Sequence, residues 1–394
     1  MAQPIKKIIQ EVHKEEIKEK PFYTLLIDGG SLLFHCMKDD KVTVNGLHYG
    51  GIYQFLLQIR MQLQKADYQY VYVFFDDEYS GLLRWRIYKD YKANRDKHYE
   101  DYAESDYMKE VNKKVNDMMA YFKRKRGKVE KEKSSWEKLI DDNFVRERDE
   151  LCRIFSELYI RWEIDEITEG DDLIAYYCKN KKENEKIVIM TGDMDLSQLL
   201  AEDVCIYNLD LKKYITKYNF ITYYNYPHEN IVVKKIFCGD TSDNIGNIKG
   251  LSEKGFYEIM PEAKNRKVTI DGVKERVKVL TEERKSNKKK PLKLHENILN
   301  GVSNKEYEGD FYEINKSLID LSEPKLSEQA KEDMDNMMYA PQDPEGRSLT
   351  NVYEIIQQIG IMELMGDTKF ASFFSPFKRL MDKEKEMFEE FEKK

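Results

Sequence analysis

The chain has 394 residues, of which 65 are Lys or Arg and 73 are Asp or Glu, so its formal charge is -8. Hydrophobic residues make up 41% and aromatic residues 12% of the sequence, which excludes an intrinsically disordered chain. No apolar run reaches the ~20 residues that a membrane span needs. The acidic balance alone argues against a nucleic-acid partner, because phosphates attract a basic surface.

The five cysteines are widely spaced without a CxxC pair, and the six histidines form no HExxH pair. The cysteines are therefore expected to be buried thiols in a reducing cytoplasm. Any metal ion is expected to be held by oxygen atoms.

The predicted strands are short apolar runs separated by segments with helical spacing. Residues 1–20 are charged and are expected to form an appended arm. The segment 49–64 has apolar residues at helical spacing. Strands that alternate with helices predict an α/β fold with a mainly parallel sheet. The predicted strands are Phe22–Ile27, Tyr70–Phe75, Ile187–Met190 and Val204–Tyr207.

Positive charge is concentrated in two segments. Lys109–Lys133 holds ten Lys or Arg against four Asp or Glu, and Lys264–Lys293 holds twelve against four. Either segment is compatible with a solvated surface, which is what most charge runs form. The region 300–394 is predicted to be helical, with Val352, Ile355, Ile356 and Ile359 on one stripe.

Acidic residues follow the predicted strands or open the helices after them. Asp28 and Asp76 each end a strand, and Glu169 and Asp172 share one face near the start of a helix. Taken singly, each position is typical of a turn or a helix start. Because ligands of parallel sheets lie beyond the carboxyl ends of the strands, the set is expected to converge. Its members are Asp28, Asp76, Glu169, Asp171, Asp172, Asp193, Asp195, Asp240 and Asp243.

Converging carboxylates raise one another's pKa unless cations neutralise them. Without Cys or His ligands, the favoured ions are hard ones such as Mg²⁺, with Mn²⁺ as a substitute. Such a site suits two-metal hydrolysis of phosphodiesters, in which ions ~4 Å apart activate water and stabilise the leaving oxygen.

The order and wording of these motifs resemble the 5'-nuclease superfamily. That superfamily includes flap endonucleases, the 5'–3' exonuclease domain of bacterial DNA polymerase I, and bacteriophage 5' nucleases such as the RNase H of T-even phages. The resemblance covers about residues 22–260. The stretches that carry it are LLIDGGSLLF, VFFDDE, YKDYKANR, ITEGDDLIAYY, VIMTGDMDLSQLL and FCGDTSDNIGNIKGLSEKGF.

The resemblance implies a PIN-like α/β fold, a mainly parallel sheet flanked by helices. The implied divisions are an arm (1–20), a nuclease domain (21–225) with a helical arch at about 96–145, a helix–three-turn–helix duplex-binding region (226–300) and a helical C-terminal region (301–394). It also implies a first metal held by Asp28, Asp76, Glu169 and Asp171. Asp172, Asp193, Asp195, Asp240 and Asp243 would hold or orient a second metal.

The YKDYKANR stretch implies the catalytic cations. Lys92 and Arg95 would stabilise charge on the scissile phosphate, because fixed cations aimed at developing negative charge are a major source of catalysis. Tyr91 would stack on a base at the strand terminus. Arg84 and Arg86 would supplement the DNA contacts. Without the other motifs, this stretch would be interpreted as the basic face of a helix.

The sequence departs from the family pattern in the helix–three-turn–helix, at Ile236–Ile259. Asn247 and Ser252 replace glycines, and Gly246 and Lys249 replace prolines. The glycine-rich loop of the family lets backbone N–H groups approach duplex phosphates. Here Lys249 and Lys254 are the candidate phosphate contacts. Asp77, in place of a family glycine, is an extra carboxylate or a turn residue.

The expected function is a Mg²⁺-dependent 5'–3' exonuclease or 5' flap endonuclease acting on DNA or RNA–DNA during primer removal in phage or bacterial replication. The expected partners are DNA with a 5' end or flap and RNA–DNA hybrids. The protein is expected to be a monomer and to have no membrane partner. A single-strand-binding protein and a sliding clamp are candidate protein partners, the latter from the aromatic segment Lys369–Phe374. The alternatives are a PIN-type ribonuclease and a catalytically silent, structure-specific DNA-binding replisome protein.

Overall fold

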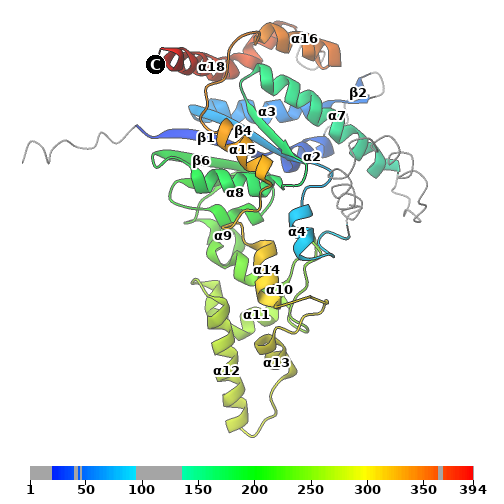
Figure 1. Ribbon diagram of the computed structural model, residues 1–394, viewed down its shortest axis with the longest axis vertical. Helices are drawn as coiled ribbons and strands as arrows, with labels where there is room; N and C mark the ends of the chain where they lie inside the picture. The colour runs from blue at the N-terminus through cyan, green and yellow to red at the C-terminus, as the bar shows by residue number, and fades with distance from the viewer. Residues whose placement is uncertain (1–19, 40–42, 45–46, 95–134, 363–366, 394) are drawn as a thin grey trace, which may run out of the picture.

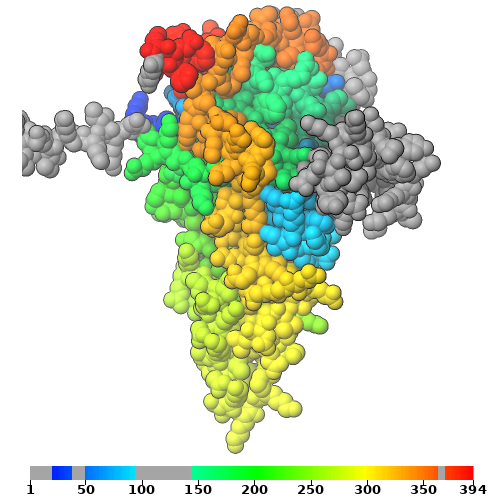
Figure 2. Space-filling model, viewed as in Figure 1, coloured from blue at the N-terminus to red at the C-terminus, as the bar shows by residue number. Residues whose placement is uncertain are grey.

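The computed structural model describes residues 20–39, 43–44, 47–94, 135–362 and 367–393. Within these residues, a sheet flanked by helices forms the broad part of the molecule, and a helical region tapers away from it to a narrow end (Figures 1 and 2). Nearly all of the expected arm, and residues 96–134 of the expected arch, lie outside the described residues. Helix α7 (Ser135–Glu157) begins within the interval expected for the arch.

The main sheet has six strands in the order β5-β4-β1-β6-β7-β8. All pairs are parallel except β7 with β8. The four predicted strands are confirmed, and each is one to three residues longer in total than predicted. A separate two-stranded hairpin joins β2 to β3. The strands are β1 (Phe22–Asp28), β2 (Thr43–Val44), β3 (Leu47–His48), β4 (Tyr68–Asp76), β5 (Arg161–Asp165), β6 (Glu185–Thr191), β7 (Val204–Asn208) and β8 (Lys213–Ile215).

Helices cover both faces of this sheet, so alternate residues of each strand enter different cores. Leu25 and Ile27 of β1 pack in one core, whereas Leu26 packs in the other. This double burial explains why the strands are continuous apolar runs. One core is completed by α2 (Gly29–Asp39), α3 (Gly50–Lys65), α7, α16 (Leu349–Ile359) and α18 (Asp367–Glu392), and the other by α8 (Gly170–Asn180), α9 (Phe220–Tyr224) and α15 (Glu328–Met337).

The narrow end has a hydrophobic core of its own. Phe237, Phe256 and Val277 are among its buried side chains, and Tyr88 and Tyr91, which follow α4 (Leu82–Ile87), join it. The predicted helix–three-turn–helix span runs from within α10 through a loop to the end of α11. The helices of this part are α10 (Ile231–Cys238), α11 (Glu253–Ile259), α12 (Ile270–Ser286), α13 (Lys293–Asn300) and α14 (Phe311–Ile319).

Helix α18 packs against α3 and β4, which makes the C-terminal region part of the sheet's own core. Phe373 is 8% exposed and Phe374 is 0% exposed, so the structure contradicts the clamp-binding interpretation of this aromatic pair. Arg161 of β5 forms a buried ion pair with Glu384 of α18. Across the described residues, no helix has both the length and the apolar character that crossing a membrane requires.

Candidate nuclease active site

The candidate site lies at the carboxyl edge of the sheet, where the neighbouring strands β1 and β6 end. The strands of this sheet that follow β1 along the chain, β4 and β5, lie on one side of it. The strand that follows β6 along the chain, β7, lies on the other side. The strand order therefore changes direction between β1 and β6, which is where ligands bind in open α/β sheets. Asp28 ends β1, and Gly192-Asp193 follows β6 at this point.

Asp28 is held by two hydrogen bonds. Its Oδ1 accepts the N–H of Ser31 at 2.9 Å, and its Oδ2 accepts the hydroxyl of Thr191 at 2.7 Å. Burial raises the pKa of Asp28 from its ordinary value of 3.8 to about 7, although both hydrogen bonds oppose the shift and the charges of Asp193 and Asp76 add to it. With no cation bound, the Asp28 carboxyl is therefore about half protonated near neutral pH.

Asp76 fixes the helix that carries the next carboxylate. Its Oδ1 accepts the N–H of Gly170 at 2.7 Å, which anchors the start of α8 beside the end of β4. Burial raises the pKa of Asp171, the next residue, well above its ordinary value, and the charges of Asp193 and Asp28 raise it further. Asp28, Asp76, Asp171 and Asp193 thus interact as one set, named here the first carboxylate group.

A second carboxylate group consists of Asp195, Asp240 and Asp243. One carboxylate oxygen from each of these residues lies within 4.8 Å of the other two. The ammonium of Lys235 on α10 forms ion pairs with Asp195 and with Asp240, the latter at 2.5 Å. Burial alone would raise the pKa of Asp240, but Lys235 and hydrogen bonds from Ser242 outweigh it and lower that pKa to about 2.

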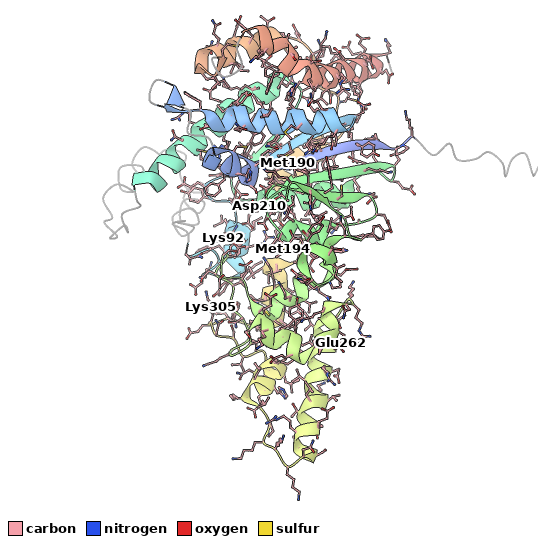
Figure 3. All side chains as sticks on the ribbon, turned by 180° about the vertical axis from the view of Figure 1, so that it is seen from behind. Lys92, Met190, Met194, Asp210, Glu262 and Lys305 are labelled. Atoms are coloured by element: carbon pink, nitrogen blue, oxygen red, sulfur yellow. The ribbon has the colours of Figure 1, made fainter. Side chains whose placement is uncertain are left out.

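The two groups are joined through the backbone of the turn after β6. Asp193 Oδ1 accepts the N–H of Asp195 at 2.7 Å, and the N–H of Asp193 donates to Thr191 Oγ1 at 2.8 Å. Figure 3 labels Met190 in the sheet and Met194 below it, where the sheet meets the helices of the narrow end. The structure thus brings seven of the nine predicted carboxylates to one edge in two connected groups.

The two remaining carboxylates are bound by protein cations. Arg84 contacts Asp172 through both terminal nitrogens, and its Nη1 lies 2.5 Å from Glu169. Asp172 is 0% exposed, and its Oδ1 also accepts the N–H of Lys325. Both oxygens of Asp172 thus bind protein donors in this structure, so Asp172 is assigned here to binding Arg84, and its expected part in holding or orienting a second metal stays a prediction.

Arg84 and Tyr91 also differ from their expected roles as DNA contacts. Arg84 is 3% exposed and Tyr91 is 2% exposed, so neither presents a surface to a bound strand. The hydroxyl of Tyr91 donates to Glu169 at 3.1 Å and lies 3.4 Å from Asp243. Both side chains position carboxylates of the site.

Lys92 lies at the site, with its ammonium bound to Glu169. Burial lowers the pKa of Lys92, but Glu169 and other negative neighbours outweigh this effect and raise the pKa well above its usual value. Lys92 is therefore a permanent cation beside Glu169, and the charges of Asp243 and Asp76 also act on it. Figure 3 labels it near Met194, where the sheet meets the narrow end. Arg95 lies outside the described residues.

The turn that carries Lys92 is docked on the loop that carries Asp243. The N–H of Lys92 donates to the carbonyl of Asp243 at 2.9 Å. The amide of Asn94 donates to the carbonyl of Thr241 at 3.1 Å, and the amide of Asn244 donates to the carbonyl of Asp90 at 2.7 Å. These hydrogen bonds hold residues 90–94, which precede the predicted arch, against the loop that carries Asp243.

The expected duplex contacts are only partly available. Lys249 and Lys254 are exposed, as is Arg86. The N–H groups of Gly246 and Lys249, however, donate to the hydroxyl of Tyr307 and the carbonyl of Val302. The backbone N–H groups at these positions therefore do not point to a duplex. Gly250 is open, since it has a φ of +86° and a Cβ there would meet nothing within 4 Å.

Sequence reasoning missed Lys235 and Thr191, and left Asp77 undecided. Asp77 accepts a hydrogen bond from Arg148 of α7 at 3.1 Å, so it anchors that helix. Lys234 and Lys235 stand together in the apolar helix sequence IVVKKIFC, and a lysine buried in such a helix requires an acidic partner. That signal could have pointed to this pair, of which Lys235 binds the site and Lys234 binds Glu253.

The residues of the two groups fit divalent metal ions. Hard carboxylate oxygens are the donors that Mg²⁺ and similar ions prefer. Burial raises the pKa of Asp28 and of Asp171, which shows that the clustered charges lack enough protein cations. A bound divalent cation would relieve this repulsion.

Comparison with known proteins gives the family. The chain matches the family model of the 5'-3' exonuclease, N-terminal resolvase-like domain, over residues 23–225. It is 33% identical over 106 residues to a 5'-3' exonuclease of Mycoplasmopsis pulmonis, covering 27% of this chain and 36% of that protein. It is 23% identical over 266 residues to DNA polymerase I of Bacillus subtilis, covering 64% of this chain and 24% of that protein. The matches thus span about a quarter to a third of these relatives.

Solved structures agree on the fold. The T5 5'-exonuclease with bound zinc superposes with a TM-score of 0.54 at 17% identity, covering 86% of this chain and 98% of that one. The T5 flap endonuclease in a pseudo-enzyme-product complex with DNA and metal ions gives a TM-score of 0.53 at 17% identity, covering 86% of this chain and 99% of that one. With the matched family domain and the paired carboxylate groups at its sheet edge, the chain belongs to the 5'-3' exonuclease family.

Proposed function

We propose that this protein is a Mg²⁺-dependent 5' nuclease that hydrolyses phosphodiester bonds of DNA, or of RNA paired to DNA, from a 5' end or flap. Removal of RNA primers during replication, in a bacterial cytoplasm, is the proposed setting. The observation that carries the proposal is the convergence of two linked carboxylate groups with Lys92 at one edge of the sheet. Family membership supports the reaction class.

The proposed ligands are the carboxylates of the two groups. Asp28, Asp76, Asp171 and Asp193 would hold one ion, and Asp195, Asp240 and Asp243 would hold the other. Glu169 is proposed to take part only when Lys92 or Arg84 releases one of its oxygens. When bound, the ions would activate water and stabilise the leaving oxygen. The proton on Asp28 near neutral pH must leave before this carboxylate can act as a ligand.

Lys92 is proposed to act as a fixed charge. Its raised pKa keeps the ammonium protonated across the working pH range, so it cannot serve as a general base. Because a scissile phosphate carries negative charge, it would compete with Glu169 for this ammonium, and the developing charge would strengthen the contact. The hydrogen bonds between the Lys92 turn and the Asp243 loop keep the ammonium at a fixed position relative to both groups.

A flap-cutting assay tests the proposal. A 5'-labelled flap duplex is incubated with the wild-type protein and with the Asp28→Asn and Asp193→Asn variants, in Mg²⁺ or in EDTA. The wild type is expected to cut only in Mg²⁺, and each variant is expected to cut at least a hundredfold more slowly. Asp210→Asn is a matched control. Asp210 lies at the same sheet edge, has a side chain that is 73% exposed, and pairs with His35 outside both groups (Figure 3).

Two outcomes would contradict the proposal. A wild-type protein that binds the flap but never cuts it in Mg²⁺ or Mn²⁺ would instead indicate a catalytically silent DNA-binding protein. Cutting of single-stranded RNA with no requirement for a 5' end would indicate a PIN-type ribonuclease. The product lengths on the same gel separate exonuclease from flap endonuclease activity.

A further inference from the structure

The helical hairpin α12–α13 ends in a strongly basic turn at the narrow end of the molecule. Residues 284–293, named here the basic tip, contain Arg284, Lys285, Lys288, Lys289, Lys290 and Lys293 and no acidic residue. Figure 1 shows α12 running along the narrow end toward its extremity, away from the sheet. With 17 residues, the helix is ~25 Å long. Positive charge is thus displaced far from the acidic site.

The basic tip is an ordered turn. The N–H of Lys289 donates to the carbonyl of Arg284 at 2.8 Å, and Arg284 Nε donates back to the carbonyl of Lys290 at 3.1 Å. Lys288 adopts a φ of +54°, which lets the chain reverse between the two helices. Thr281 of α12 contacts the buried His295 of α13 at 2.9 Å, which fixes the hairpin below the turn.

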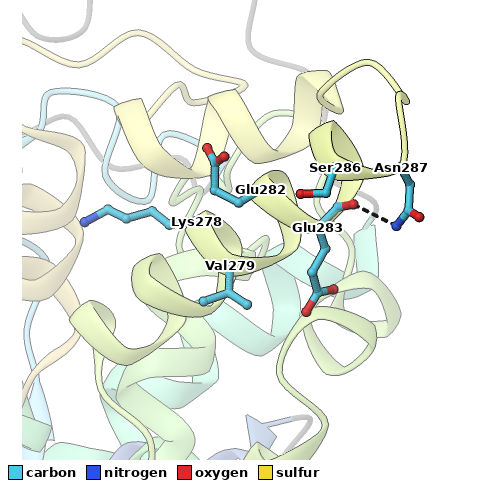
Figure 4. Close-up of a pocket in the computed structure, with 6 residues that line it drawn as sticks. All are labelled: Lys278, Val279, Glu282, Glu283, Ser286 and Asn287. Atoms are coloured by element: carbon cyan, nitrogen blue, oxygen red, sulfur yellow. Dashed lines mark hydrogen bonds between the residues drawn. The ribbon is translucent and has the colours of Figure 1, made fainter.

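The lysines of the tip point into solvent. Lys288, Lys289 and Lys290 are all exposed, and none of them forms an ion pair with any acidic residue that the structure describes. The neighbouring surface of α12 is different. It presents Lys278, Val279, Glu282 and Glu283 in a shallow hollow (Figure 4), and Lys278 is paired with Glu275. The hollow therefore carries more acidic than basic residues, whereas the tip carries no acidic residue.

The hairpin is rigidly connected to the loop that carries the open Gly250. The amide of Asn297 on α13 donates to the carbonyl of Lys249 at 2.9 Å. The eight residues of α13 span ~12 Å, and with the turn the three lysines lie roughly 15–20 Å from Lys249. Since successive base pairs are 3.4 Å apart along a duplex, this distance corresponds to about five base pairs.

We propose that the basic tip is a second binding site for the phosphate backbone of the duplex, about five base pairs beyond the loop at Lys249 and Gly250. The inference rests on the proposed function, because it takes the helix–three-turn–helix loop as the first duplex contact. A duplex is the favoured partner because the lysines are ordered, exposed and separated from that loop by a fixed spacer. Contact with phosphates through lysine charges would be independent of base sequence.

The test measures binding by fluorescence anisotropy in an Asp193→Asn background, which prevents cutting. Flap substrates carry duplex arms of 4 or 18 base pairs on the side of the helix–three-turn–helix. The variant Lys288→Ala/Lys289→Ala/Lys290→Ala is compared with the control Lys369→Ala/Lys378→Ala/Lys393→Ala. The control removes the same charge from exposed positions at α18, at the opposite end of the molecule (Figure 1).

The tip variant is expected to bind the long arm at least tenfold more weakly than the control near 0.15 M salt. The slope of log affinity against log salt is expected to fall by about 2.7, since each phosphate contact contributes about 0.9. Binding of the short arm is expected to be equal in both variants, because it does not reach the tip. Thermal melting checks that the variants are folded.

Equal losses in the two variants, or a loss that does not depend on arm length, would overturn the proposal. Equal binding of the long arm by the two variants would instead leave an acidic protein segment as the alternative partner of the tip. This test is independent of the cutting assay. If the protein fails to cut in Mg²⁺ but shows the length-dependent loss, the nuclease proposal fails and the duplex contact stands.

Discussion

Replacement of Asp28 by Asn is expected to stabilise the metal-free protein while abolishing its activity. The native carboxyl has a pKa of about 7, whereas its ordinary value, taken for the unfolded chain, is 3.8. Between these values the native state holds a proton that the unfolded chain has released, so the free energy of unfolding falls as the pH rises. Above pH 7 the native state carries the full penalty of an ionised, buried carboxylate.

The magnitude follows from the two pKa values. The rise of the pKa from 3.8 to about 7 corresponds to about 4 kcal/mol of destabilisation at pH 8, since one pKa unit is about 1.4 kcal/mol. At pH 5 the native carboxyl is already neutral, and the same relation leaves only about 2 kcal/mol. The neutral Asn is not subject to this penalty, and its amide can still accept from Ser31 and donate to Thr191 Oγ1. Any cost of rearranging these hydrogen bonds does not depend on pH.

The assay is thermal unfolding in EDTA at pH 8 and at pH 5. An unfolding entropy of about 2.1 cal/mol/K per residue gives about 0.8 kcal/mol/K for 394 residues. The melting temperature of Asp28→Asn is therefore expected to exceed that of the wild type by about 5 °C at pH 8 and by about 2 °C at pH 5. The Asp210→Asn variant corrects for the removal of one negative charge at the same edge.

Two results would refute this reasoning. If Asp28→Asn raises the melting temperature equally at both pH values, the gain does not come from the buried charge. If Asp28→Asn is less stable than the wild type at pH 8, the hydrogen bonds of Asp28 outweigh its desolvation. A saturating divalent ion should remove the difference at pH 8, because the wild type gains the cation and the variant does not.

Three further changes test other parts of the site and core. Arg84→Met leaves Asp172 and Glu169 without their shared cation and is expected to lower the free energy of unfolding by about 3–5 kcal/mol in urea titrations. Adding Asp172→Leu should recover part of this loss, and no recovery would contradict the pairing. Lys235→Met is expected to lower the melting temperature in EDTA. It is also expected to enlarge the increase of the melting temperature on adding Mg²⁺, because a divalent ion replaces the lost ammonium. An unchanged increase would argue against a metal between Asp195 and Asp240. Glu384→Leu leaves the buried Arg161 without its partner and is expected to lower the free energy of unfolding in urea by about 3 kcal/mol or more. The cutting rate at 25 °C is expected to stay unchanged. An unaltered free energy of unfolding would show that the pair is not part of the folded core.

Much of the sheet could be predicted from the sequence because both of its faces are buried. Short apolar runs such as Phe22–Ile27 are typical of strands with both faces buried, and their ends place Asp28 and Asp76 at one edge. Strand β5 was not predicted. Its sequence RWEID contains three charged residues, and Arg161 is acceptable at the sheet edge only because Glu384, 223 residues later, neutralises it.

The convergence of the carboxylates could be predicted, but their individual bonding could not. Asp171 and Asp172 are adjacent in sequence and differ by one helical step of about 100°. That step turns Asp171 toward Asp28 and Asp193, and Asp172 toward Arg84. Which of two neighbouring acids receives a distant arginine depends on tertiary contacts 88 residues apart, which no local pattern encodes.

The position of α18 has a consequence for the order in which the chain is made. Every described carboxylate of the two groups precedes residue 244, yet the core beneath β4 also contains Phe374, Phe377 and Leu380. During translation, that face of the sheet cannot be covered until about residue 380 has left the ribosome. A ribosome-bound fragment with all its acidic residues in place would still lack a closed core. The proposed nuclease activity is therefore expected only from chains in which the segment from Phe374 to Leu380 has also been made and packed onto the sheet.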